Sequence, residues 1–476
     1  MNLIKSTGTF SFFVLISRIL GYLRDVLIAI YLGSGPIADA FFVAFRIPNT
    51  FRRLFSEGTF NSAFVPSYMK ELNSGKKRAK IFAGNIFNFL TLVILFFVLV
   101  VEIFMPWFVF LIAPGFTENS YKLDMTINLT RITFPFLLFV SLSSFFGAIL
   151  NSHNKFAAAS AAPIILNIFL IFYTRKIYFP AVSFKINYNS KLKFFFRKLI
   201  PSIFSSGVTQ INILVGTIIA SFQASAVSYL YYADRIYQIN LAIAGIAIGT
   251  VLLPSLSKYV EKKNEKKIKF IQNKSLELCL FLSIPATFAL LISSEEITSA
   301  LFGYGSFIQT SVKNSAFALY FFSFGLPAFA LIKVFSSYIF ARQNTKTPFI
   351  FSIYSVVINI SLSLYYFDDL GFIIIPIATT ISSWVNALML FIFITKKKYF
   401  EFENYFIFSI FKIILNSTIS AFIFYQMINF FNDFLVYESQ YKLVTIILLV
   451  IITFIFYILL SIITKAFKIS DITLRY

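Results

Sequence analysis

The chain has 476 residues, of which 58% are hydrophobic and only 13% are charged, a balance that excludes an ordinary soluble domain and is typical of a polytopic α-helical membrane protein. The formal net charge of +21 does not indicate a nucleic-acid partner, because most of the lysines lie in short loops between apolar runs. A single cysteine and a single histidine exclude a disulfide framework and a Cys/His metal cluster. We expect Cys279 to be a core residue and His153 to be a solvated loop residue.

Apolar runs long enough to cross a bilayer recur along the whole chain. A transmembrane helix needs about 20 apolar residues, and by this measure about thirteen segments are candidate spans. They lie near residues 9–32, 36–68, 82–112, 126–150, 156–173, 201–222, 226–257, 272–302, 314–341, 347–367, 371–395, 405–430 and 441–464. The sequence therefore predicts an all-α polytopic membrane fold.

Loop charges predict which side of the membrane each loop occupies. Lysine and arginine cluster in alternate loops, at 70–80, 175–198, 258–274, 342–346, 396–398 and 465–475. Because basic loops stay in the cytoplasm, we expect these loops and the N-terminus on the cytoplasmic side. Residues 185–200 combine lysines with aromatic residues, which predicts an amphipathic linker that lies on anionic headgroups.

The segment 38–66 is apolar, yet it carries several charges. A charge at bilayer depth costs roughly 2.5–3.5 kcal/mol on insertion scales, so such residues generally face a water-filled cavity or a partner. Asp39, Arg46 and Arg53 are seven residues apart and Glu57 follows four residues later, so all four share one face of a helix. Arginine suits bidentate capture of phosphate or carboxylate, which predicts an arginine-lined cavity for an anionic substrate.

Other apolar runs carry charges as well. In the first run, Arg18 and Asp25 are seven residues apart, and Arg24 lies about 100° around the helix from Asp25. Arg52 is another candidate and follows Pro48, a proline that we expect to kink the helix. The remaining candidates are Asp234 and Arg235, with Gln238 one turn after Asp234, and Lys333. Cations exceed acids in this set by about three, a surplus that favours an anionic headgroup such as a pyrophosphate.

Alternative interpretations are open for several of these residues. Asp234 and Arg235 could form an architectural ion pair, and Arg18 and Arg24 could extend to a headgroup region. The sequence is equally compatible with two positions of Lys333: its side chain extends to the headgroups, or it lies in the cavity.

An internal repeat divides the chain into two halves. Residues 62–67 recur in type as 250–255, and Arg46 and Arg235 each precede the proline of their copy by about twenty residues, as expected for a transporter built from repeats. We therefore predict two pseudo-symmetric helical lobes around one cavity, followed by a helix pair outside the repeat. The predicted domains are an N-lobe (1–184), a linker (185–200), a C-lobe (201–398) and the C-terminal pair with its tail (399–476).

The two halves differ in their number of candidate spans. The second half contains six candidate spans and the first contains five. The loops before and after 156–173 both carry the charge pattern of cytoplasmic loops, so an even number of crossings is expected between them. Either 156–173 does not cross fully, or the loop charges misassign one half. The pattern of the second half favours the first option, which makes 156–173 a half-inserted or surface helix.

No catalytic constellation is present in the sequence. We find no phosphate-binding loop of the Walker type, no zinc-protease motif and no Ser/His/Asp set. We therefore expect no enzymatic activity, no catalytic residue, no cofactor and no metal site.

Four stretches carry a resemblance to a known family. They are SRILGYLRDVLIA (17–29), ADAFFVAFRIPNTFRRLFSEGTFNSAFVP (38–66), YYADRIYQINLAIAGIAIGTVLLPSLSK (231–258) and ARQNTKTP (341–348). Together they resemble the MurJ (MviN) family, lipid II flippases of the MOP exporter superfamily. The resemblance implies two six-helix lobes in a V, as in MATE-like transporters, with a C-terminal helix pair that forms a lipid-tail groove. It also implies a multi-pass protein of the bacterial cytoplasmic (inner) membrane with a role in peptidoglycan, cell-wall and cell-shape biosynthesis.

The resemblance also assigns roles to residues of this chain. Headgroup and pyrophosphate binding would fall to Arg24, Asp25, Arg52, Glu57 and Arg235. Cavity electrostatics would depend on Arg18, Asp39 and Asp234, to which the residue patterns add Arg46, Arg53 and Lys333.

The chain departs from the family pattern in three places. Gln238 stands where glutamate is frequent, so one ion pair is lost, and the sixth helix is largely missing between Tyr173 and Lys185. Some members bind sodium through acidic groups, but no carboxylate is found around Gly216 or at 359–363, so membrane potential is the expected driving force.

We therefore predict a flippase that translocates lipid II by alternating access, with the pyrophosphate held by cavity arginines. The expected partners are lipid II and membrane lipids, with cell-wall synthesis proteins as further candidates and without nucleic acid. Two alternatives are open: a MOP-type exporter of another lipid-linked saccharide or of drugs, and a non-transporting cell-wall scaffold.

Overall fold

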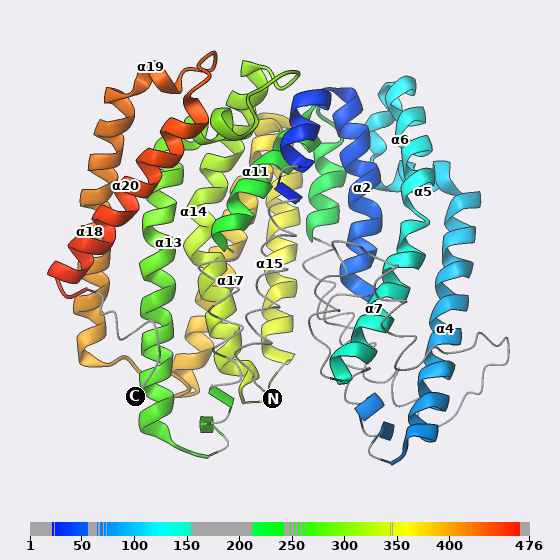
Figure 1. Ribbon diagram of the computed structural model, residues 1–476, viewed down its shortest axis with the longest axis horizontal. Helices are drawn as coiled ribbons and strands as arrows, with labels where there is room; N and C mark the ends of the chain where they lie inside the picture. The colour runs from blue at the N-terminus through cyan, green and yellow to red at the C-terminus, as the bar shows by residue number, and fades with distance from the viewer. Residues whose placement is uncertain are drawn as a thin grey trace. The chain divides into compact units, whose positions relative to one another are not determined.

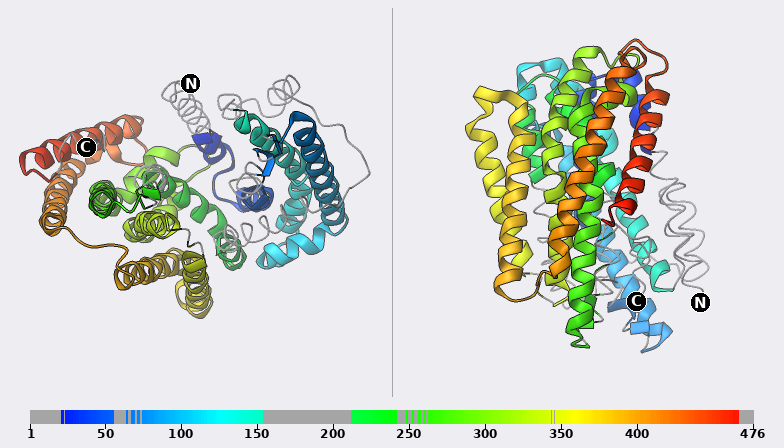
Figure 2. Two further views of the ribbon diagram at one scale, coloured as in Figure 1. Left: turned by 90° about the horizontal axis from the view of Figure 1, so that it is seen from below. Right: turned by 90° about the vertical axis from the view of Figure 1, so that its left-hand side faces the viewer.

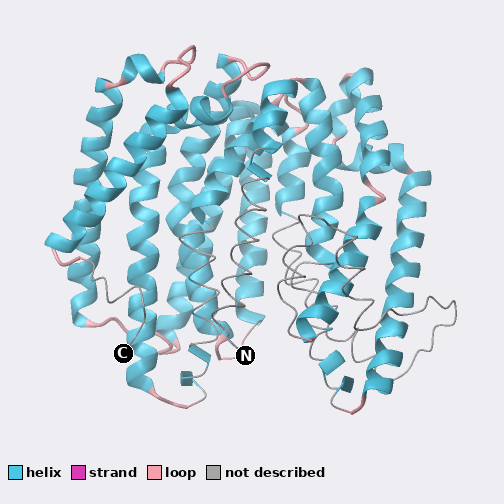
Figure 3. Cartoon of the chain, in the orientation of Figure 1, coloured by secondary structure: helices cyan, strands magenta, loops and turns pink. Residues whose placement is uncertain are grey.

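The computed structural model describes residues 21–22, 24–55, 64, 67–69, 71–72, 74–153, 212–241, 248, 252, 256–257, 259–260, 262–342, 344 and 346–466. Among these residues the secondary structure is helix, joined by turns and short loops, with no strand (Figure 3). Contacts within the chain define two compact units. Unit 1 comprises Met1–Ile28 and Pro36–Phe222, and unit 2 comprises Ala29–Gly35 and Gln223–Tyr476.

The described helices of unit 1 are labelled in Figure 1. They are α2 (Pro36–Phe55), α4 (Lys76–Ile103), α5 (Met105–Ile112), the short 3-10 helix η1 (Pro114–Glu118), α6 (Ser120–Thr133) and α7 (Phe136–Ser152). Residues 24–28 and 212–220 are also helical and belong to this unit. Its core is aromatic, since Phe64, Phe82, Phe87 and Phe145 pack together between α4 and α7.

Unit 2 contains the longest helices of the described chain. They are α11 (Ala226–Leu241), α13 (Glu265–Phe302), α14 (Gln309–Phe340), α15 (Lys346–Tyr365), α16 (Phe367–Leu370), η3 (Gly371–Ile373), α17 (Ile374–Lys396), α18 (Asn404–Phe430), α19 (Asn432–Leu435) and α20 (Lys442–Ile463). Cys279 of α13 is fully buried, as predicted.

Eight of the described helices are long and apolar enough to cross a membrane. They are Lys76–Ile103, Ser120–Leu150, Glu265–Phe302, Gln309–Phe340, Lys346–Tyr365, Phe367–Lys396, Tyr405–Phe430 and Lys442–Ile463. Each corresponds to one predicted span, so the all-α polytopic class is confirmed. The other predicted spans lie wholly or partly outside the described residues, as do the surface helix at 156–173, the linker at 185–200 and the missing sixth helix.

Each unit includes a short segment from the other half of the sequence. In unit 2, Ser306 N donates to Ile30 O at 2.8 Å, and Tyr232 Oη donates to Gly33 O at 3.0 Å. Gly33 has φ +62°, and a Cβ there would lie 2.2 Å from Ser306 O, so only glycine fits this turn. In unit 1, Gly115 N donates to the hydroxyl of Ser221 at 3.1 Å. The division into two units does not test the predicted domain boundaries at 184, 200 and 398, which stay predictions.

Helix α2 continues through Pro48 to Phe55. Because proline has no N–H, the carbonyl of Ala44 loses its intrahelical donor. Thr133 of α6 supplies the replacement, since its Oγ1 donates to Ala44 O at 2.9 Å. A neighbouring hydroxyl thus satisfies the freed carbonyl, which allows a proline inside a helix of an apolar fold.

The C-terminal helices α18 and α20 pack against each other and against α13 (Figure 2). Their contact is polar at one end, because Asn416 Nδ2 donates to Ser461 Oγ at 3.3 Å and to Thr464 Oγ1 at 2.8 Å. Tyr457 Oη donates to Phe281 O of α13 at 2.9 Å. Side-chain hydrogen bonds of this kind hold helices together in lipid, where burial of apolar surface gives no net gain.

At its other end, this pair is held by a buried lysine. The Nζ atom of Lys442 donates to Gly303 O at 2.6 Å and to Tyr437 O at 2.5 Å. It also lies 4.4 Å from the ring centroid of Tyr304 and 4.5 Å from that of Tyr437. Lys442 is 2% exposed, so these two carbonyls and two ring faces compensate its loss of water.

Replacing Lys442 by methionine should lower the stability of unit 2 by about 1.5–3 kcal/mol, the range for a hydrogen-bonded charged group. The cost arises because two buried carbonyls lose their donor. Thermal unfolding of the purified protein in detergent measures the effect. Lys397→Met, at an exposed position, is the matched control and should leave the unfolding temperature unchanged. Equal unfolding temperatures for the two variants would contradict the anchoring role of Lys442.

His153 is half-buried after the end of α7, so the expectation of a solvated loop residue is wrong. Its Nε2 atom lies 3.1 Å from Tyr68 Oη, and the two rings meet edge to face. Burial, with a smaller contribution from Lys76, lowers the pKa of His153 below its usual range. The neutral imidazole is therefore the form that the folded state favours.

This shift predicts a pH dependence of stability. The unfolded chain binds the histidine proton more readily, so the stabilisation should be complete above about pH 6.5, the unfolded value, and should be lost as pH falls through the folded pKa. The slope cannot exceed about 1.4 kcal/mol per pH unit for one proton. Chemical unfolding from pH 8 to 5 measures it, and His153→Gln should flatten the profile. An unchanged slope in that variant would refute the assignment.

Candidate functional site

Arg24 is fixed in position within unit 1, yet it stays accessible. Its Nη2 and Nε atoms donate to Asp25 Oδ1 at 2.8 and 3.1 Å. Its guanidinium carbon lies 4.9 Å from the ring centroid of Phe45 on α2. The side chain of Arg24 is 45% exposed, whereas that of Asp25 is 4% exposed.

This arrangement leaves part of the guanidinium available to a ligand. Asp25 occupies the edge formed by Nε and Nη2, and the guanidinium carbon lies over the ring of Phe45, while Nη1 donates to no group among the described residues. A planar guanidinium held by one edge presents its other donors in a fixed direction, which suits a phosphate or carboxylate. Arg24 and Asp25, both predicted as binding residues, are thus in direct contact.

The structure describes the side chain of Arg46 but not the side chains of the later α2 arginines. Arg46 Nη1 donates to Thr217 Oγ1 at 2.6 Å and so connects α2 to the helical segment 212–220 within unit 1. For Arg52 and Arg53 only the helical backbone is described. Arg18 and Glu57 lie outside the described residues. The predicted helical stripe is thus traced in the structure from Asp39 to Arg46.

Asp39 lies in a closed ion pair. Its Oδ2 atom accepts a hydrogen bond from Lys122 Nζ of α6 at 2.7 Å, and Asp39 is 0% exposed. The ammonium group lies 3.8 Å from the ring centroid of Phe116. A buried pair with this geometry fixes α2 against α6 rather than presenting a free charge.

Lys122 is a buried charge that the sequence patterns described above do not include. It is the only basic residue between 114 and 124, a stretch otherwise poor in lysine and arginine, and that isolation was the available signal. A lone lysine among loops of low basic content indicates a specific partner better than a topological role.

In unit 2 the charged residues of α11 have hydrogen-bond partners along their own helix. Arg235 Nη2 donates to Tyr231 Oη at 2.6 Å, and its guanidinium carbon lies 4.7 Å from the centroid of that ring. Asp234 Oδ2 accepts a short hydrogen bond from Gln238 Nε2. Both contacts join residues four apart, the spacing of one helical turn. Lys333 is exposed on α14, a position compatible with both of its predicted roles.

At residues 359–363, where some family members are expected to bind sodium through acidic groups, the side chains named here are neutral and form hydrogen bonds. Asn359 Nδ2 of α15 donates to Thr379 Oγ1 of α17 at 3.0 Å, and Ser363 Oγ donates to Asn359 Oδ1 at 3.1 Å. These contacts join α15 to α17. Among the described residues, no group of three or more acidic, histidine or cysteine side chains could hold a metal ion.

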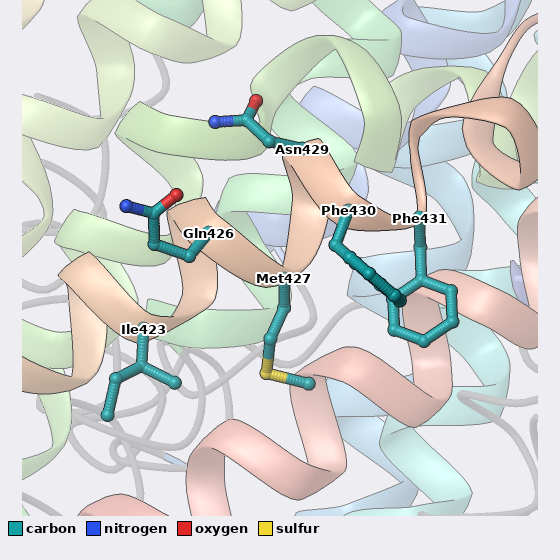
Figure 4. A pocket seen from close by; sticks show the side chains of 6 residues that line it. All are labelled: Ile423, Gln426, Met427, Asn429, Phe430 and Phe431. Carbon is teal, nitrogen blue, oxygen red and sulfur yellow. The ribbon is translucent and has the colours of Figure 1, made fainter.

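A surface hollow on α18 is lined by uncharged side chains (Figure 4). Its residues are Ile423, Gln426, Met427, Asn429, Phe430 and Phe431. Met427 points toward α20, where Thr453 Oγ1 lies 4.0 Å from its sulfur. Without a cation, this hollow does not suit an anionic group.

Comparison with known proteins identifies the family of this chain. A family model described as "Lipid II flippase MurJ" matches residues 28–175 and 168–446. The chain belongs to the MurJ family. Among curated MurJ relatives, a probable lipid II flippase of Rhizobium meliloti (strain 1021) is 39% identical over 82% of this chain and 80% of its own length. One of Rickettsia prowazekii (strain Madrid E) is 34% identical over 94% of both chains.

Solved structures agree with the MurJ assignment. A lipid II flippase MurJ in an inward closed conformation matches with a TM-score of 0.80 and 27% identity, over 96% of this chain and 98% of its own. An inward-facing multidrug transporter of the MATE family, MOP superfamily, matches with a TM-score of 0.64 and 14% identity, over 79% of this chain and 93% of its own, which shows the shared fold alone. The predicted MurJ family, MOP-type fold and multi-pass membrane character are confirmed.

Breaking the Asp39–Lys122 pair should destabilise unit 1. Asp39→Asn or Lys122→Met alone should cost about 3–5 kcal/mol, because each leaves a buried charge without its partner. The double variant should recover most of that loss, since both charges are then absent. Thermal unfolding in detergent measures all three variants, with Asp124→Asn at an exposed position of α6 as control. A double variant as unstable as the sum of the single ones would contradict a direct ion pair.

Proposed function

We propose that this chain flips lipid II across the cytoplasmic membrane by alternating access, with the pyrophosphate held on arginines and the lipid tail left in the bilayer. Membership of the MurJ family supports the substrate and the transport class. The observation that carries the binding mode is the geometry of Arg24, a half-exposed guanidinium that Asp25 and Phe45 hold in place.

The chemistry of a pyrophosphate explains why such an arginine is useful. Its oxygens accept charge-assisted hydrogen bonds, which are roughly twice as strong as neutral ones. Asp25 orients Arg24 while the site is empty, so less rotational freedom is lost when the anion binds. Arg235, Arg52 and Glu57 stay proposed substrate-binding residues. Asp39 has a separate role, as its carboxylate is paired with Lys122.

The driving force that we propose is the membrane potential. Moving one elementary charge across 100 mV corresponds to about 2.3 kcal/mol. Because the cytoplasm is negative, outward movement of an anionic headgroup is favourable in sign. Asn359 and Ser363 lie where acidic sodium-binding groups would be expected, and both are neutral, which favours the membrane potential over sodium coupling.

The orientation and partners of the chain are part of the proposal. The positive-inside rule favours cytoplasmic basic loops and a cytoplasmic N-terminus in the inner membrane. Transport requires no covalent step, so we propose no enzymatic activity. Membrane lipids contact the broad apolar surface, and cell-wall synthesis proteins are candidate partners.

In-cell translocation of lipid II tests the function directly. A host depleted of its own flippase would express this chain, and an externally added hydrolase would report whether newly made headgroup reaches the outer face. Accessible headgroup supports the proposal. A stably inserted protein without headgroup exposure would overturn it and favour a scaffold.

Arg24→Ala and Arg235→Ala should each abolish translocation without loss of protein from the membrane, because each removes charge-assisted bonds to the anion. The hydrolase assay and quantitative membrane immunoblots measure the two quantities. Arg131→Ala, at an exposed position of α6, is a matched arginine control and should keep full activity. Near-normal transport by well-expressed Arg24→Ala would refute the arginine site.

A further inference from the structure

Arg24 rests on an aromatic stack of α2. Its guanidinium carbon lies 4.9 Å from the ring centroid of Phe45. The ring of Phe45 is in turn nearly parallel to that of Phe41, one turn earlier, with an interplanar angle of 8° and centroids 5.8 Å apart. The plane of Phe45 is thus fixed by its own helix, and Arg24 comes from a different helical segment.

Arg235 has a similar arrangement in unit 2. Its guanidinium carbon lies 4.7 Å from the ring centroid of Tyr231, and Nη2 donates to the phenol oxygen of the same residue at 2.6 Å. Tyr231 is 6% exposed and meets Tyr232 edge to face at a centroid distance of 5.8 Å. In both units, therefore, a candidate anion-binding arginine has an aromatic ring against its guanidinium.

We propose that Phe45 and Tyr231 are positioning residues for headgroup binding, which act by holding the guanidiniums of Arg24 and Arg235 in a fixed plane. The inference rests on the proposed function, because it assumes that these arginines bind the pyrophosphate.

The physical reason is the geometry of the guanidinium group. A ring face attracts the cation through its quadrupole, an attraction that strengthens when water is excluded. A ring that holds the guanidinium carbon over its face takes none of the five N–H donors through this contact, so donors are left for hydrogen bonds to an anion. An aliphatic side chain of equal size would fill the space but would not attract the cation. The ring chemistry, rather than its bulk, is what the proposal requires.

Fluorinated phenylalanines at position 45 separate ring chemistry from bulk. Successive fluorine atoms weaken the quadrupole with little change in shape, so the affinity for lipid II should fall stepwise, by about 2- to 30-fold overall. Affinity would be measured by thermophoresis on the full chain in nanodiscs, with lipid II as the probe. Phe42, 0% exposed on the same helix and next to Phe41, is the matched control at which fluorination should leave affinity unchanged.

The outcomes separate this inference from the proposed function. If Arg24→Ala weakens lipid II binding and fluorination at 45 does not, the positioning role is refuted and the arginine site stands. If Arg24→Ala has no effect, the arginine site itself fails, and the inference fails with it. Equal losses at positions 45 and 42 also overturn the inference, because they indicate a general packing effect. In an Arg24→Ala background, fluorination at 45 should cause no further loss.

Tyr231 permits a second, independent test. Tyr231→Phe keeps the ring and removes the hydrogen bond, whereas Tyr231→Leu removes both, so lipid II affinity should fall in that order. In an Arg235→Ala background, neither change should weaken binding further, because the residue acts through that arginine. Additive losses in the double variants would contradict the positioning role of Tyr231.

Discussion

A charged side chain in an apolar environment must find its partners within the protein, since neither lipid nor an apolar core offers any. The described residues meet this constraint in two different ways. Asp39 and Lys122 form a pair closed off from solvent, and Lys442 is enclosed by carbonyls and tyrosine rings. Arg24 is held by Asp25 and Phe45 but keeps nearly half of its side chain exposed. Closed pairs fix helices to one another, whereas an open one can still bind a ligand.

The same constraint applies to the backbone. Pro48 removes a donor from the middle of α2, and the hydroxyl of Thr133 replaces it at the carbonyl of Ala44. This bond lies on the same two helices as the Asp39–Lys122 pair, so α2 and α6 are joined at two points. Arg46 then connects α2 to the segment 212–220. Because α2 is fixed in this way, Phe45 presents its ring to Arg24 in a defined orientation.

Helical periodicity predicted the spans and the charged stripe of α2, but it could not predict the partners. Spacing fixes the direction of a side chain on its own helix, whereas the neighbouring helix depends on tertiary packing. Asp39 and Arg46 share a helical face, yet one bonds to Lys122 of α6 and the other to Thr217. Lys122 is far away in sequence and belongs to no recognisable motif. The contact between Arg24 and Asp25 was not predicted either, because neighbours in sequence lie about 100° apart around a helix.

The two halves repeat in sequence, and each has charged residues with identified hydrogen-bond partners. Among the described residues, Arg24 of unit 1 donates to the carboxylate of Asp25, and in unit 2 Arg235 donates to the phenol of Tyr231 while Asp234 accepts from the amide of Gln238. A glutamate at 238 would place a second negative charge one turn from Asp234, where like charges repel. Glutamine removes that charge and keeps a hydrogen bond, so the electrostatic potential around Arg235 becomes more positive. A neutral amide at position 238 is therefore compatible with the anionic ligand proposed above.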